Sequence, residues 1–96
     1  MSIRKYGYVA KPIGADKKRE ARNLGEAIGS LVTDLRIKKG WSQPELAHRL
    51  GFNESTIRIL EMATKSPTLR TLEAVAHAFS MDILDFIRHA KRRIKR

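Results

Sequence analysis

Helix-capping residues recur along residues 23–82, and their spacing sets the strongest limit on what this chain can fold into. Each candidate cap is a Ser, Thr, Asn or Asp that stands directly before a stretch with apolar residues at helical spacing. The caps are Asn23, Ser42, Asn53, Thr68 and Asp82. A Glu follows each of the first two caps by three residues, which is the pattern of a capping box. The spacing predicts five short helices and therefore an all-α domain.

Glycines follow the first two predicted helices, and apolar faces run along the last two. Gly40 and Gly51 readily take the left-handed backbone conformation that ends many helices. Helices this short depend on packing of their apolar faces against one another, so we expect one compact core. On the last two helices we assign to this core Leu69, Leu72, Val75, Ala76, Phe79, Ile83, Leu84, Phe86, Ile87, Ala90 and Ile94.

The chain has 96 residues and a formal net charge of +10, and the basic excess lies at its two ends. Residues 24–86 hold seven basic and eight acidic residues, whereas residues 87–96 hold six basic residues and no acidic ones. Such an excess favours a polyanionic partner, nucleic acid first and an anionic membrane surface second. We predict a basic N-terminal arm over 1–22, a helical domain over 23–87 and a basic C-terminal tail over 88–96.

The first residues of the arm differ in character from the rest of the chain. Apolar and basic residues are mixed over 1–14, and Pro12 and Gly14 interrupt any regular structure. We expect an extended arm with a short strand over Ile3–Val9. An isolated strand is unstable, so this one would need a partner strand, such as its copy in a second subunit.

Several classes of function are excluded by residues that the sequence lacks. It has no cysteine, which rules out disulfides, thiolate metal sites and cysteine nucleophiles. His48, His77 and His89 do not have the paired spacing of a metal site, and we find no catalytic grouping or phosphate-cradling glycine loop. We expect no enzyme, no metal and no cofactor. With no secretion signal and no membrane span, we expect a cytoplasmic protein.

The stretch from Trp41 to Glu61 has the features of two helices that meet at a large angle through a tight turn. Ala47 is small enough to let the second helix cross closely, and Gly51 gives the turn its backbone freedom. Apolar residues attach the unit to its neighbours, and the opposite side of the second helix is left free for the major groove of DNA.

Residues 28–86 resemble the lambda-repressor-like (Xre/Cro) helix-turn-helix family. The matching pieces, in order, are Ser42-Gln43, Glu45-Leu46-Ala47, Leu50-Gly51, Ser55-Thr56-Ile57, Glu61, Pro67-Thr68-Leu69 and Leu72. The resemblance implies a compact five-helix domain that binds double-stranded DNA. It also implies a transcription regulator, a repressor above all, that acts as a homodimer on a palindromic operator.

The resemblance assigns roles to individual residues. Those that would read bases from the recognition helix are Asn53, Glu54, Ser55, Thr56, Arg58 and Ile59. Those that would contact phosphates, from the start of the preceding helix and the loop after the recognition helix, are Gln43, Thr64, Lys65, Ser66 and Thr68. Arg36 and Glu61 match an arginine and a glutamate that form a structural ion pair in similar repressors.

One position departs from the family pattern. The family often has a glycine two residues after this glutamate, where the recognition helix ends, and this chain has Ala63. A left-handed cap is less favourable for alanine, so we expect the helix to run longer or to end differently.

Two other functions remain open from the sequence. An antitoxin-like autoregulator would bind a toxin-like partner protein as well as DNA, and the arm over 1–14 would suit that role. A membrane-surface helix would use the apolar face of Ile83, Ile87, Ala90 and Ile94, flanked by basic residues. We favour the simpler interpretation, in which this face extends the last helix and packs against protein, with no membrane partner.

Overall fold

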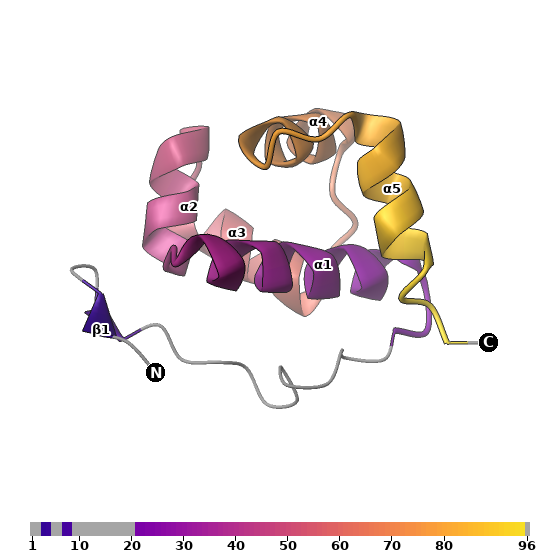
Figure 1. The fold of residues 1–96 in the computed structure, drawn as a ribbon, viewed down its shortest axis with the longest axis horizontal. Helices are drawn as coiled ribbons and strands as arrows, with labels where there is room; N and C mark the ends of the chain where they lie inside the picture. The colour runs from indigo at the N-terminus through magenta and orange to yellow at the C-terminus, as the bar shows by residue number, and fades with distance from the viewer. Residues whose placement is uncertain (1–2, 5–6, 9–20, 96) are drawn as a thin grey trace.

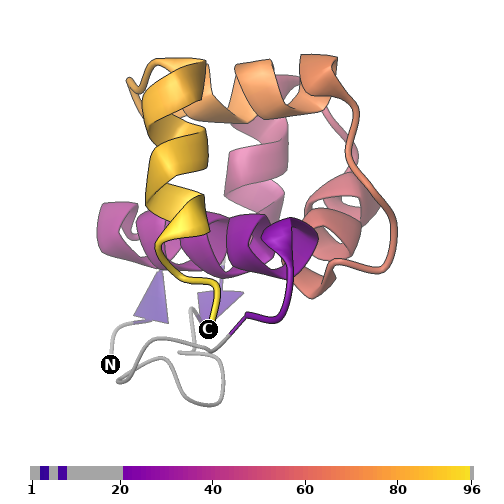
Figure 2. The same ribbon diagram turned by 90° about the vertical axis from the view of Figure 1, so that its right-hand side faces the viewer.

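The computed structural model describes residues 3–4, 7–8 and 21–95, and five helices form its body (Figure 1). The helices are α1 (Leu24–Lys39), α2 (Gln43–Leu50), α3 (Glu54–Met62), α4 (Leu69–Ala78) and α5 (Ile83–Lys91). The predicted five-helix fold is confirmed. In both ribbon views α1 lies opposite α4 and α3 lies beside α1 (Figure 2). Figure 1 shows α2 and α5 at the two ends of the body.

Two short strands lie within the predicted arm. β1 (Ile3–Arg4) and β2 (Gly7–Tyr8) pair antiparallel with each other, with Ile3 opposite Tyr8. The sequence suggests one strand with a partner from a second subunit, and the structure instead provides the partner within the chain. Residues 1–2, 5–6, 9–20 and 96 lie outside the described residues.

The helix starts follow the local chemistry of their caps. The side chains of Asn23, Ser42 and Thr68 each accept a hydrogen bond from the backbone N–H three residues later. Asp82 accepts one from the N–H of Leu84. Asn53 holds the cap position of α3 but makes no such bond, so the start of α3 depends on its packing and on the turn before it.

The helix ends include one correction. Gly40 and Gly51 take left-handed conformations, as expected. Ala63 does so too, with φ 57° and ψ 36°, and its N–H donates to the carbonyls of Ile59 and Leu60. The expectation that α3 would run longer or end differently is therefore wrong. It ends at Met62, because these two hydrogen bonds offset the cost of left-handed alanine.

Replacing Ala63 with glycine is expected to stabilise the fold by about 1 kcal/mol, because glycine adopts this conformation without a steric penalty. Urea unfolding followed by circular dichroism measures the change. Ser80→Gly offers a second left-handed position, with φ 56°, where a gain of the same sign is expected. A loss of stability in Ala63→Gly would contradict this explanation of the cap.

The core takes one large, fully buried side chain from each helix. These side chains belong to Val32, Leu46, Ile57, Val75 and Phe86. Two assignments to the core are wrong, since Leu69 is 75% exposed and Leu84 is 62% exposed. Leu69 begins α4 one turn before Leu72, at the edge of the body. On α5 the buried residues Phe86 and Ala90 lie on one side of the helix, and Leu84 lies on the other side.

The two ends of the domain meet in what we call the terminal clasp, formed by Ala21 with residues 93–95. Ala21 is fully buried and pairs with Ile94 in a parallel bridge. Its N–H donates to the carbonyl of Arg93 at 3.3 Å, and its carbonyl accepts from the N–H of Lys95 at 2.7 Å. The end of the chain is thereby held against the start of α1.

The predicted tail over 88–96 is in large part built into the body. Its first residues complete α5, and Ile94 packs against the core. The Arg93 side chain, 10% exposed, donates to Ser30 and forms an ion pair with Asp34, both on α1. The apolar face of α5 thus packs inward. No helix within the described residues has the length and apolar content needed to cross a bilayer.

Candidate nucleic-acid interface

The α2–turn–α3 unit presents one side of α3 to solvent and buries the other. The N–H of Phe52 donates to the carbonyl of Ala47 at 2.9 Å and closes the turn after Gly51. Ile57 and Leu60 then pack into the core, which fixes the rotation of α3. Of the six residues assigned to base reading, four are exposed, namely Asn53, Glu54, Ser55 and Arg58, and two are half-buried, namely Thr56 and Ile59.

A salt bridge lies on the exposed side of α3. Arg58 Nη1 lies 3.4 Å from Glu54 Oε2, and about half of each side chain is exposed. A pair this exposed to water contributes little to stability, so either side chain can leave the pair and bind a ligand instead. The exposed side of α3 therefore offers an acceptor, a donor and the hydroxyl of Ser55 within about one helical turn.

The loop after α3 lies next to this helix and carries four of the residues assigned to phosphate contact. Thr64, Lys65, Ser66 and Thr68 are all exposed. A hollow of about 180 Å³ separates the loop and the start of α4 from the side of α3 that bears Thr56 and Ile59. Thr68 also caps α4, since its Oγ1 accepts from the Thr71 N–H at 3.1 Å. The structure thus brings these loop residues and α3 together on one side of the molecule.

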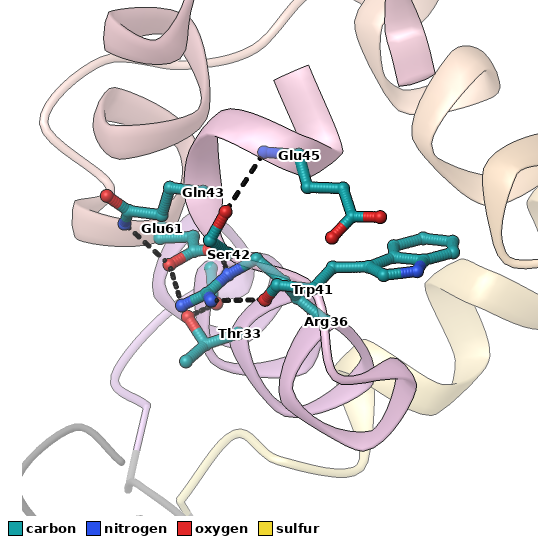
Figure 3. Close-up of polar contacts among 8 residues, drawn as sticks. Thr33, Arg36, Trp41, Ser42, Gln43, Glu45 and Glu61 are labelled. Atoms are coloured by element: carbon teal, nitrogen blue, oxygen red, sulfur yellow. Dashed lines mark hydrogen bonds and ion pairs between the residues drawn. The ribbon is translucent and has the colours of Figure 1, made fainter. Parts of the chain in front are cut away.

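Gln43 has a second role that its position in the sequence does not indicate. Its Nε2 donates to Glu61 Oε1 at 2.9 Å, so the side chain assigned to phosphate contact is tied to α3 (Figure 3). Gln43 is the first residue of α2, where backbone N–H groups lack helical partners and the helix dipole is positive. The bond between Gln43 and Glu61 therefore fixes the start of α2 against α3. The backbone N–H groups at the start of α2 remain suited to binding an anion.

A buried ion pair joins α1 to α3. Arg36 meets Glu61 through two contacts, Nε to Oε2 at 2.6 Å and Nη2 to Oε1 at 3.1 Å. The guanidinium also donates to the carbonyl of Trp41 at 2.9 Å (Figure 3). The two side chains are only 7% and 5% exposed. One guanidinium thus connects α1, the loop before α2 and the end of α3, which sets where α3 stands on the domain.

Trp41, which lies just before α2, makes contacts through its aromatic ring. The ring of Trp41 stacks on that of Phe79 with centroids 5.6 Å apart, and the Arg49 guanidinium lies 4.2 Å from the centre of the indole ring. Arg49 also pairs with Glu45 at 3.1 Å. The Trp41 ring therefore packs against side chains of the protein itself. The sequence did not predict the contact between Trp41 and Phe79, because Phe79 follows α4 and is far from Trp41 along the chain.

The described part of the chain contains no group of three or more His, Asp or Glu side chains that could hold a metal ion. The acidic residues near α3 each pair with an arginine, in Glu54–Arg58 and Glu61–Arg36. The surface made by α3, the start of α2 and the loop after α3 is thus suited to recognition of a ligand by hydrogen bonds and charge.

Comparison with known proteins gives matches over the same part of the chain. A helix-turn-helix family model matches residues 32–86. The transcriptional repressor RstR of a cryptic CTXphi phage of Vibrio cholerae is 30% identical over 60 residues, which cover 62% of this chain and 54% of the repressor. This chain therefore matches about half the length of that relative. The HTH-type transcriptional regulator y4dJ of Sinorhizobium fredii is 29% identical over 65 residues, 68% of this chain and 84% of the relative.

Solved structures share the fold. The clp gene regulator ClgR of Corynebacterium glutamicum superposes with a TM-score of 0.70 at 26% identity, over 82% of this chain and 100% of the other. The restriction-modification controller protein C.Esp1396I, solved as a tetramer with its 35-base-pair operator, gives a TM-score of 0.66 at 18% identity, over 76% and 96% of the two chains.

Proposed function

Because this chain belongs to the lambda-repressor-like (Xre/Cro) helix-turn-helix family of DNA-binding transcription regulators, we propose that it is a repressor that binds a palindromic operator as a homodimer. In this proposal α3 enters the major groove and reads base edges with its exposed residues. The start of α2 and the loop after α3 contact the phosphates on either side of the groove.

The observation that carries the proposal is the division of α3 into a buried side and a free side. Ile57, Leu60 and Glu61 are buried, whereas Glu54, Ser55 and Arg58 are exposed at the other side. In the proposed complex Glu54 accepts from a cytosine amino group and Arg58 donates to guanine or to a phosphate. Ser55 bonds to a base edge, and the partly exposed Ile59 contacts a thymine methyl.

The proposal of a homodimer follows from the size of the recognition surface. One α3 of nine residues reaches only a few base pairs, which gives little discrimination among the many sites of a genome. Two copies related by a twofold axis read two half-sites about one helical turn apart, and a palindrome mirrors that symmetry. Repressors and gene regulators are the described roles of the relatives RstR and ClgR.

Selection of bound sequences from a pool of random duplexes tests the proposal. We expect an enriched motif made of two inverted half-sites. Light scattering on the complex with the selected duplex should then give a mass of two chains per duplex. A pool that shows no enrichment after repeated rounds would contradict sequence-specific binding, and an enriched motif bound by a single chain would contradict the dimer.

A further inference from the structure

The terminal clasp joins the point where the arm enters the domain to the end of the chain after α5, at one corner of the molecule. The arm joins the domain at Ala21, and Ala21 is bonded on both sides to residues 93–95. Figure 2 looks onto this corner, where the start of α1 lies next to the end of the chain. Arg22, next to Ala21, and Arg93 and Lys95, which flank Ile94, are therefore brought to the same corner of the fold.

Ion pairs neutralise three cations at this corner, in Arg22–Glu26, Arg88–Asp85 and Arg93–Asp34, but they leave two others without an acidic partner. In the described residues, Asp34, Asp85 and four glutamates are each engaged by an arginine; the glutamates are Glu26, Glu45, Glu54 and Glu61. Lys91 and Arg92, at the end of α5, are exposed and have no acidic partner among the described residues.

An open hollow marks the surface of this corner. It has a volume of about 330 Å³ and is lined by Arg88, Lys91, Arg92 and Ile94. Three of the four lining side chains are cationic, and only Arg88 has an ion-pair partner among the described residues, the exposed Asp85. Cations gathered around a concave surface attract anionic groups more strongly than the same charges spread over a convex one.

The chemistry of the corner favours phosphates of a nucleic acid over a bilayer. A helix that binds a membrane surface needs an exposed apolar face beside its charges. Here Ala90 is fully buried, and Ile83, Ile87 and Ile94 pack against the core. Leu84 is the one large apolar side chain that α5 exposes, and a single leucine does not make the apolar face that a membrane-surface helix needs.

We propose that the corner formed by the terminal clasp is a second DNA-binding surface, which holds the phosphate backbone of duplex DNA irrespective of sequence. This second proposal depends on the proposed function only because it takes duplex DNA as the ligand. Lys91 and Arg92, which are exposed and have no acidic partner among the described residues, supply the charges that contact the phosphates. The corner belongs neither to α3 nor to the loop after it, so it contributes affinity without reading bases.

The test neutralises charge and leaves the clasp intact. Truncation at residue 88 would remove the Arg93 contacts and the packing of Ile94, so a loss of charge could not be separated from a loss of stability. Lys91→Gln/Arg92→Gln changes only exposed side chains. Binding of the full chain to a random-sequence duplex is measured by fluorescence anisotropy over a range of salt concentrations. We expect the slope of log K against log salt to become shallower by about 1.8, or ~0.9 for each phosphate that the variant no longer neutralises.

Two controls make the outcome specific. Lys91→Arg/Arg92→Lys keeps both charges and should retain the slope of the original protein. Amide shifts of the isotope-labelled protein on adding the same duplex should include residues 88–95. An unchanged slope in the glutamine variant, or shifts confined to 43–68, would overturn the second surface. So would binding to phosphatidylserine vesicles that is abolished in this variant while duplex binding is unaffected. Selection of an operator does not enter this test, so the two proposals fail separately.

Discussion

Replacing Arg36 with methionine is expected to lower the free energy of unfolding by about 3–5 kcal/mol, which is the usual cost of leaving a buried charge without its partner. Glu61 is 5% exposed, and both of its carboxylate oxygens face the guanidinium. Methionine fills a similar volume but offers no charge, so the buried carboxylate would no longer have the guanidinium to balance it. Urea unfolding at neutral pH measures the loss.

Two further variants separate the charge effect from general damage. Arg58→Met removes one partner of an exposed pair on α3, so a loss below about 1 kcal/mol is expected. Arg36→Met/Glu61→Leu removes both buried charges and should recover a large part of the stability that the single variant loses. If Arg36→Met proves no more harmful than Arg58→Met, the ion pair does not fix α3 on α1.

Replacing Gly29 with alanine is expected to cost about 2–3 kcal/mol, because α1 and α3 meet at this point with no room for a methyl group. A Cβ atom there would lie 2.5 Å from the carbonyl oxygen of Glu61 and 2.8 Å from that of Leu60. Both neighbours are backbone atoms of α3, so the helix itself would have to move. Since α3 carries the proposed base-reading residues, specific DNA binding should weaken along with stability.

Gly25 provides the matched control on the same helix. A Cβ there meets nothing closer than Asn23 Oδ1 at 3.4 Å, an ordinary contact. Gly25→Ala should therefore leave stability unchanged or raise it by up to about 1 kcal/mol through helix propensity. Thermal unfolding of the two variants side by side gives the difference, and equal melting temperatures would show that the close approach of α1 and α3 is not limiting.

Local chemistry explains how much of the fold was predictable. A cap such as Ser42 and a stop such as Gly51 act within a few residues, so the sequence shows them directly. The exposure of Leu84 depends on which side of α5 meets α1, and the contact between Ala21 and Ile94 joins the two ends of the chain. Neither leaves a local pattern. The end of α3 at Ala63 was not predictable from propensity, because propensity yields to hydrogen bonds that only the folded turn provides.

Some residues of the candidate site could be predicted more fully from the sequence than others. The exposed positions of α3, including Glu54 and Ser55, follow from family spacing, because the buried side of the helix fixes the free side. The bond from Gln43 to Glu61 joins residues on two different helices, and the family pattern indicates only a phosphate contact for Gln43. Arg93 was assigned to a basic tail, since nothing in the sequence indicates that its side chain pairs with Asp34 on α1.

The central claim is that α3 selects the operator through its exposed residues. Sequence selection from random duplexes, run in parallel on the original protein and on Glu54→Ala/Ser55→Ala, tests it most directly. Glu73→Ala, which removes an exposed charge from α4, serves as the control. We predict that the control selects the original motif. The α3 variant should select a different one, while its affinity for random duplexes stays within about threefold. An unchanged motif in the α3 variant would contradict the claim.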